Sequence, residues 1–173
     1  VNEKSFIKRA VVELGIPYLG LCLGHQLLAE ALGGEVGKSK KPEIGVLSVN
    51  LTEIGSQGVF FDGVDEEFKC LQWHSAEVTR LPYDAEVLAS SSDCTVQALK
   101  WGTRAFSIQF HLEVEEHTVQ DWGKIPTYAE ALWSAMGPEG LERLSMDCKK
   151  EMANFNNNAE RVYLNWMQTS ART

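Results

Sequence analysis

Residues 17–26 read P-Y-L-G-L-C-L-G-H-Q, and this stretch joins an apolar run to a helical pattern with Cys22 at the junction. A strand that turns sharply into a helix forms a nucleophile elbow, in which the side chain at the turn projects from the end of the sheet. Gly20 and Gly24 flank the cysteine and allow neighbouring backbone to pass close to it. The N–H groups at the start of a helix favour a thiolate and can donate to an oxyanion. We therefore expect Cys22 to be a reactive thiol.

The composition of the chain limits the classes of function. With 173 residues, 44% of them apolar, we expect a single domain over residues 1–173 that ends in a helical segment at 138–173. The net charge of -8 argues against binding to nucleic acid or to an anionic membrane, because both require clustered Lys and Arg. The short basic cluster Lys38, Lys40 and Lys41 is typical of a solvated loop.

The cysteines indicate a reducing compartment. All four are scattered, without the spacing of a zinc site or a disulfide framework, at positions 22, 70, 94 and 148. No run approaches the roughly 20 apolar residues that a membrane-spanning helix needs, and the first residues do not resemble a secretion signal. The run at 111–117 contains two histidines but not the H-E-x-x-H spacing of a metal site. We expect a cytoplasmic protein without a metal or another cofactor.

The periodicity of apolar residues predicts an α/β domain with a central sheet and flanking helices. Beyond the strand of the elbow, β-like runs occupy 45–51, 69–73, 86–90, 95–99 and 105–110, and the last two form a hairpin. Helices are expected over 4–14, 24–32, 114–122, 126–136 and 138–168, the last with a break near 154–158. The Gly, Lys and Pro residues at 37–42 predict a loop.

Three segments with polar or reactive side chains follow expected strands. They are G-L-C-L-G-H-Q at 20–26, Q-W-H-S-A-E at 72–77 and Q-F-H-L-E at 109–113. In open α/β sheets the ends of strands form the crevice in which ligands bind, so these segments can converge. Cys22, His111 and Glu113 then make a nucleophile, a base for its proton and a carboxylate that orients the imidazole.

These segments resemble a class I glutamine amidotransferase domain, of the type found in GMP synthase and its free-standing relatives. The resemblance covers about residues 1–120. It implies a flavodoxin-like three-layer sandwich with a mixed, mostly parallel central sheet flanked by helices. It also implies that Cys22 attacks the side-chain amide of glutamine and that His111 and Glu113 complete a catalytic triad.

The resemblance further implies a set of substrate and oxyanion residues. The backbone N–H of Leu23 would donate to the oxyanion, and Gln26 would help to hold the substrate. The middle segment would surround the amino-acid end of glutamine, although His74 alone could equally be a structural histidine. The full set is Gly20, Leu23, Gln26, Trp73, His74 and Ser75.

Two features separate this chain from the general family pattern. Leu112 stands where many members have the proline of F-H-P-E, which favours the free-standing branch. The family takes a second oxyanion N–H from a glycine-rich turn well upstream of its cysteine, and Cys22 comes too early in this chain to have that turn before it. We expect a domain truncated at its N-terminus, whose first strands are missing.

Three hypotheses of function remain open. The first is hydrolysis of glutamine through a cysteinyl thioester, with ammonia passed to a separate synthase. The second keeps the triad but cleaves a γ-glutamyl peptide or a γ-glutamyl amine. The third is a non-catalytic, amidotransferase-like binding subunit or fragment, in which an exposed sheet edge could pair with another copy of the chain.

Overall fold

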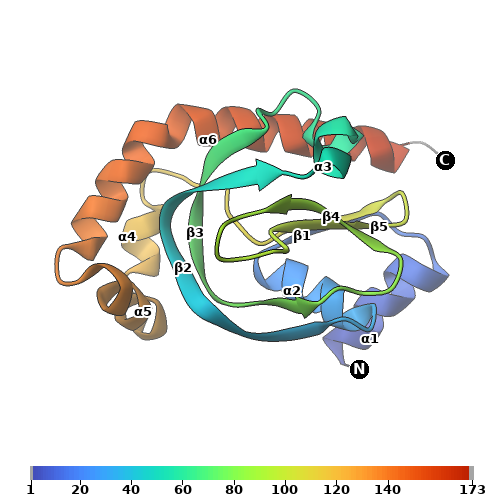
Figure 1. Ribbon diagram of the computed structural model, residues 1–173, viewed down its shortest axis with the longest axis horizontal. Helices are drawn as coiled ribbons and strands as arrows, with labels where there is room; N and C mark the ends of the chain where they lie inside the picture. Colours follow the sequence, from blue (N-terminus) through green and yellow to red (C-terminus); the bar gives the residue numbers. More distant parts are fainter. Residues whose placement is uncertain (1, 172–173) are drawn as a thin grey trace.

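The computed structural model describes residues 2–171, which are organised by a six-stranded sheet (Figure 1). The strands lie side by side in the order β1-β6-β5-β4-β2-β3. The two long strands β2 and β3 curve around the shorter ones, so the sheet is curled (Figure 1). The strand bounds are β1 (Tyr18–Leu21), β2 (Glu35–Leu51), β3 (Glu67–Arg80), β4 (Ala85–Ser90), β5 (Ala98–Trp101) and β6 (Ala105–Ile108).

The sheet is mixed, as expected for this α/β fold, but most of its described pairings are antiparallel. β1 pairs with β6 in parallel, whereas β2–β3, β2–β4, β4–β5 and β5–β6 are antiparallel. The expected mostly parallel sheet thus differs from the observed one. β3 to β6 follow one another without the crossover helix that a parallel pair of neighbouring strands requires, and only the short helices α3 and η2 separate β2 from β3. The predicted hairpin around residues 101–103 joins β5 to β6.

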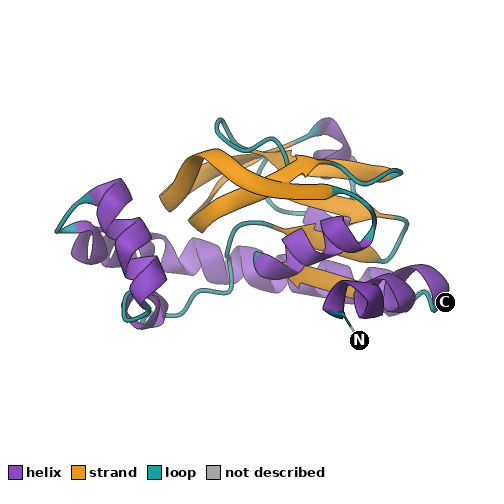
Figure 2. Cartoon of the chain, turned by 90° about the horizontal axis from the view of Figure 1, so that it is seen from below, coloured by secondary structure: helices purple, strands orange, loops and turns teal. Residues whose placement is uncertain are grey.

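Helices cover both faces of the sheet, which confirms the three-layer arrangement (Figure 2). Along β6, Phe106 and Ile108 pack toward α6 and the short helix η2, while Ala105 packs toward α1 and α2. A third apolar core lies where β2 and β3 meet α4, α5 and the first half of α6. The helices are α1 (Glu3–Lys8), η1 (Arg9–Glu13), α2 (Leu23–Ala31), α3 (Glu53–Gln57), η2 (Val59–Phe61), α4 (Thr118–Trp122), α5 (Pro126–Met136) and α6 (Gly140–Ala171).

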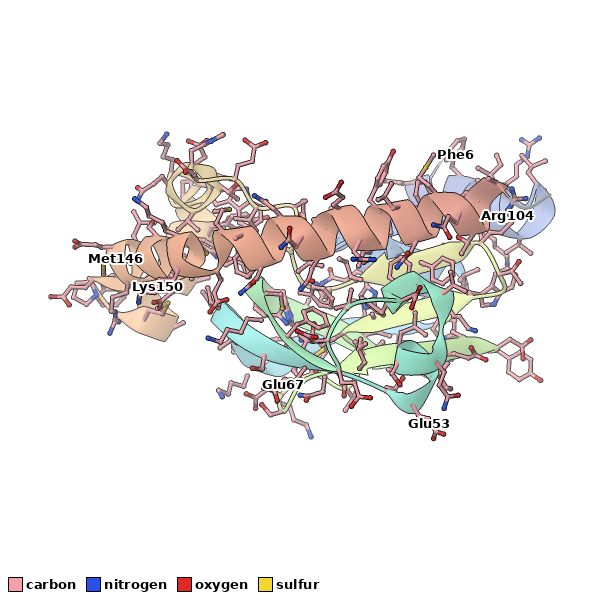
Figure 3. The ribbon with its side chains drawn as sticks, turned by 90° about the horizontal axis from the view of Figure 1, so that it is seen from above. Phe6, Glu53, Glu67, Arg104, Met146 and Lys150 are labelled. Carbon is pink, nitrogen blue, oxygen red and sulfur yellow. The ribbon has the colours of Figure 1, made fainter. Side chains whose placement is uncertain are left out.

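The last helix, α6, is continuous, so the predicted break near 154–158 is wrong. Phe155 is fully buried in the third core, and packing of this kind outweighs the low helix propensity of the neighbouring asparagines. Farther along, Asn165 donates to the carbonyl oxygens of Phe60 and Asp62 at 3.2 and 3.0 Å. Near the end, Arg104 donates to the carbonyl of Ser170 at 2.7 Å and fixes the helix to the β5–β6 turn (Figure 3). Among the described helices, none combines the length and the apolarity needed to cross a bilayer.

The loop predicted at 37–42 is also wrong, because these residues lie in the first half of β2. The pairing of β2 with β3 shifts register between Lys38 and Glu43, which is the mark of a β-bulge or a similar irregularity. The Gly, Lys and Pro residues are therefore absorbed by an irregular strand instead of ending it. Lys41 on this segment forms an ion pair with Asp93 at 2.6 Å.

Gly20 lies where β1 passes the first turn of α2. A Cβ atom at this position would stand 2.7 Å from the backbone carbon and oxygen of Gly24 and 2.7 Å from a ring carbon of Tyr18. Backbone atoms cannot move aside as a flexible side chain can. The elbow therefore depends on a glycine in the strand, before the cysteine.

We predict that Gly20→Ala lowers the free energy of unfolding by about 1–3 kcal/mol, because the added methyl group must push strand and helix apart. Gly24→Ala is the matched control, since its Cβ would meet only the Tyr18 hydroxyl at an ordinary 3.5 Å. We expect this control to stay within about 0.5 kcal/mol of the parent chain. Urea denaturation of both variants measures the difference, and equal losses would contradict the close approach at Gly20.

Candidate active site

Cys22 occupies the turn between β1 and α2 in a conformation that is unusual for a residue with a side chain. Its φ of 47° and ψ of -98° lie outside the common regions, which places strain at this residue. Two hydrogen bonds hold the turn: the Cys22 N–H donates to the carbonyl of Ile108 at 2.9 Å, and the Gln26 N–H donates to the carbonyl of Cys22 at 3.2 Å. The strand–turn–helix expected from the sequence is present, and its cysteine is partly accessible.

His111 is brought beside Cys22 by the segment that follows β6. Backbone bonds between His111 and Leu71 run in both directions, at 2.9 and 3.1 Å, and tie this segment to β3. The imidazole is mostly buried, and its interaction with Cys22 is one of the causes that raise its pKa. Its Nδ1 lies 2.5 Å from Oε1 of Glu113. The three residues that the sequence nominated as a triad are therefore in contact, in the order cysteine, histidine, glutamate.

The charges of this group favour a protonated imidazole. Burial alone would lower the pKa of His111, but hydrogen bonds and charge interactions with Cys22 and Glu113 outweigh it and raise the pKa of His111 to about 9. For Glu113, burial acts to raise the pKa, but the bond to His111 and the Leu112 N–H at 3.0 Å lower it below its ordinary value. At neutral pH the pair is thus a carboxylate that orients an imidazolium.

An aromatic cluster, formed by Trp73, Trp122 and Tyr128, borders His111. The Trp122 ring meets the imidazole edge to face, with centroids 4.7 Å apart. The ring centroid of Trp73 lies 5.7 Å from that of Trp122 and 5.9 Å from that of Tyr128. Strand β3 thus contributes one ring, and helices α4 and α5 contribute one ring each. These rings limit the access of water to the histidine, which strengthens its interactions with its charged neighbours.

The predicted residues Leu23 and Gln26 follow Cys22 in the first turn of α2. Leu23 begins α2, so its N–H belongs to the first turn of that helix, and its side chain is exposed. The Gln26 amide nitrogen donates to the carbonyl of Ala76 at 3.2 Å and to Oε1 of Gln109 at 3.0 Å. Gln26 therefore links the elbow both to β3 and to the segment that carries His111.

The middle segment does not present its three predicted side chains to one place. His74 faces the opposite side of β3 from its neighbours, because successive residues of a strand alternate, and Trp73 and Ser75 border different features. Trp73 points into the aromatic cluster, and Ser75 lines a separate cleft of about 470 Å³ beside Lys41 and Asp93. His74 faces the interior, where its Nε2 lies 3.2 Å from Oε2 of Glu43. Its Nδ1 lies 3.0 Å from the carbonyl of Ala76, so the ring is engaged by protein on both sides.

The other histidines have different environments. His25 is fully buried beside Ser107, at 2.9 Å, and burial lowers its pKa to about 3, so it is a neutral packing residue. His117 is exposed near Glu115 and Asp121. Within residues 2–171, no group of three or more His, Cys, Asp or Glu side chains has an arrangement suited to a metal ion.

One site residue was missed by the sequence analysis. Gln109 is completely buried, and its Nε2 donates to the Cys22 sulfur at 3.5 Å. The available signal was its position in Q-F-H-L-E, two residues before His111 and thus on the same side of an extended segment. Also missed was Glu43, a buried carboxylate that accepts hydrogen bonds from Ser91 and Gln97, each at 2.7 Å.

Comparison with known proteins extends these observations. The family model described as "Glutamine amidotransferase class-I" matches residues 1–122. The chain is 40% identical over 119 residues to one subunit of the glutamine-hydrolyzing GMP synthase of Sulfolobus acidocaldarius, a match covering 68% of this chain and 61% of that protein. It is 44% identical over 108 residues to the glutamine-hydrolyzing GMP synthase of Aeropyrum pernix, a match covering 62% of this chain and 20% of the relative.

A solved structure shows the same fold. The crystal structure of a glutamine amidotransferase from Thermotoga maritima superposes with a TM-score of 0.81 at 26% sequence identity, covering 95% of this chain and 67% of that one. The chain spans about three fifths of its Sulfolobus relative, at 61%. The matched region contains the elbow, the strand bridged to His111 and the histidine–glutamate pair, and the chain belongs to the class I glutamine amidotransferase family.

Proposed function

We propose that this domain hydrolyses the side-chain amide of glutamine and releases ammonia for transfer to an acceptor. The observation that carries the proposal is the contact of a strained, partly accessible Cys22 with an imidazolium that is itself held by a carboxylate. A thiol beside such a histidine is the arrangement of a nucleophile for acyl transfer. Membership of the class I glutamine amidotransferase family supports glutamine as the acyl donor.

In the proposed reaction, the Cys22 sulfur attacks the γ-amide carbon of glutamine and forms a carbon–sulfur bond. The negative charge on the carbonyl oxygen is met by the N–H of Leu23 at the start of α2. His111 gives its proton to the nitrogen as the carbon–nitrogen bond breaks, and ammonia leaves. His111 then takes a proton from water, whose oxygen displaces the sulfur and yields glutamate. Glu113 keeps the imidazole oriented through both halves.

We propose that the acceptor of ammonia is a separate synthase protein. The Sulfolobus relative is named as one subunit of a glutamine-hydrolyzing GMP synthase, which supports a division of the work between two chains here as well. The expected compartment is the cytoplasm, where thiols such as Cys22 stay reduced. Formation of a complex with the synthase, measured by co-purification, would test this partner.

Replacement of the nucleophile tests the proposal directly. Cys22→Ala is expected to lower ammonia release from glutamine at least about 10³-fold, because no other group can form the thioester. Cys148→Ala is the control, since Cys148 is a buried cysteine in the third core and does not touch the triad. Equal rates for Cys22→Ala and the parent chain would exclude the assignment.

Labelling separates catalysis from simple binding. A diazo-ketone analogue of glutamine should alkylate the parent chain at Cys22 and should not react with Cys22→Ala, as intact-mass and peptide measurements would show. Failure to label a folded parent chain would favour the third hypothesis, a non-catalytic binding protein.

The carboxylate can be tested through the pH dependence of the histidine. Glu113→Gln keeps a hydrogen-bond acceptor but removes the charge that helps to raise the pKa of His111 from 6.5 to about 9. The imidazolium is then less stabilised, so its proton should be lost at lower pH, closer to 6.5. The stability that this proton contributes in the parent chain, present below pH 6.5 and lost as the pH rises through 9, should also end at lower pH.

Titration of the histidine ring protons by NMR measures this change without any need for catalysis. Glu115→Gln is the control, because Glu115 lies 3.4 Å from the exposed His117 and is not among the groups that shift His111. A His111 titration that is the same in Glu113→Gln and the parent chain would contradict the assigned pair.

A second candidate, cleavage of γ-glutamyl amines or peptides, is favoured by the aromatic cluster. In the proposed reaction His111 protonates the leaving amine, and Trp122 lies 4.7 Å from that ring. Aromatic faces bind apolar groups well, so an amine that carries an apolar substituent could be accommodated there. If glutamine is the substrate, kcat/KM on glutamine should exceed that on γ-glutamyl peptides and anilides. The opposite order would favour the second candidate.

A further inference from the structure

Gln109 contacts both Cys22 and Gln26 and is not one of the three residues of the predicted triad. Its side chain is completely buried just beyond β6, where it touches the Cys22 sulfur and Gln26. We propose that the Gln109 amide is a positioning group for the nucleophile, which donates an N–H to the Cys22 thiolate in addition to the interaction of Cys22 with His111. The inference rests on the proposed function in that it concerns the same sulfur, but it does not require that glutamine be the substrate.

The orientation of the Gln109 amide is fixed by its neighbours. Gln26 has two N–H groups, and both are used: one donates to the carbonyl of Ala76 and the other to Oε1 of Gln109. Since an N–H of Gln26 points at the Gln109 oxygen, that oxygen is the acceptor and the nitrogen is turned to the sulfur, at 3.5 Å. Reversing the amide would bring two N–H groups together and would direct an oxygen at a thiolate.

Backbone hydrogen bonds also hold Gln109 in place. Its own N–H donates to the carbonyl of Gln97 at 2.8 Å, and the Cys22 N–H donates to Ile108, the preceding residue. The side chain therefore cannot drift away from the sulfur without disrupting the β1–β6 junction. The Gln109 amide is buried, and Gln26 and the backbone fix its orientation. Such a preorganised donor can stabilise a charge without having to reorient.

The Gln109 amide is a neutral donor, whereas His111 is a cation. The cation is His111, which interacts with Cys22, and its imidazole is held by the Glu113 carboxylate. Gln109 adds a hydrogen bond without adding charge, so it stabilises the thiolate without lowering the proton affinity of His111 as a second cation would. A hydrogen bond to a charged group favours the charged form, and its loss should shift the thiol toward its neutral form.

The test is the rate of alkylation of Cys22 by iodoacetamide as a function of pH, with the adduct located by peptide mass measurement. Gln109→Met has nearly the same shape but no donor, and its rate profile should move upward by about one pH unit. Below the midpoint of the parent chain, this shift appears as a rate about tenfold lower at a given pH. Gln109→Glu should move the profile farther, because a carboxylate would face the thiolate.

Gln97→Met is the matched control. Gln97 is also completely buried, and its amide donates to Glu43 and Ser91 instead of the sulfur. We expect its alkylation profile to coincide with that of the parent chain. Circular dichroism and thermal unfolding would verify that each variant is folded. An unchanged profile in folded Gln109→Met, or an equal shift in Gln97→Met, would overturn the proposal.

A second variant decides the question if Gln109→Met does not fold. Gln26→Met leaves Gln109 in place but removes the N–H that orients its oxygen, and Gln26 is only half-buried. The profile should then move upward by a smaller amount, and no movement would overturn the proposal. A shifted profile in a chain that releases no ammonia would support the role of Gln109 while rejecting the glutaminase function.

Discussion

The parallel pairing of β1 with β6 is the constraint on which the site depends. Tyr18 to Leu21 lie against Ala105 to Ile108 in register, so both strands end at the same edge of the sheet. Cys22 directly follows β1. Gln109 directly follows β6, and His111 comes two residues later. The hydrogen bond from the Cys22 N–H to the Ile108 carbonyl continues this ladder into the strained turn. Residues 89 positions apart, as 111 - 22 = 89, are thus brought within contact.

Beside the cysteine, histidine and glutamate, a buried polar network connects the elbow to the long curved strands β2 and β3. Glu43 on β2 accepts from Ser91 and Gln97 and lies beside His74 on β3. Through the Ala76 carbonyl, His74 shares a partner with Gln26, which in turn meets Gln109. A carboxylate that is only 3% exposed is costly unless it is hydrogen-bonded, so these contacts favour one mutual arrangement of β2, β3 and β5. His74, for which the sequence left a substrate-binding and a structural role open, is part of this buried network.

The surroundings of Cys22 combine a strained turn with contacts from residues that are distant in the sequence. The Cys22 turn is strained, whereas the imidazole, the carboxylate and the amide near it all come from residues 109–113, which follow β6. That segment is tied to β3 through Leu71 and is shielded by Trp122 from α4. The match to the class I glutamine amidotransferase family covers both the turn and this segment.

Much of this was readable from the chain itself. The elbow, the histidine–glutamate pair, the helices near 4–14, 24–32 and 126–136 and the hairpin at 101–103 depend on neighbouring residues, so their patterns are local. The antiparallel majority of the sheet, the continuous α6 and the strand through 37–42 depend on packing that overrides propensity. The roles of Gln109, Glu43 and His74 likewise required the folded structure. A buried polar side chain takes its function from partners distant in sequence, and no spacing along the chain encodes which partners those are.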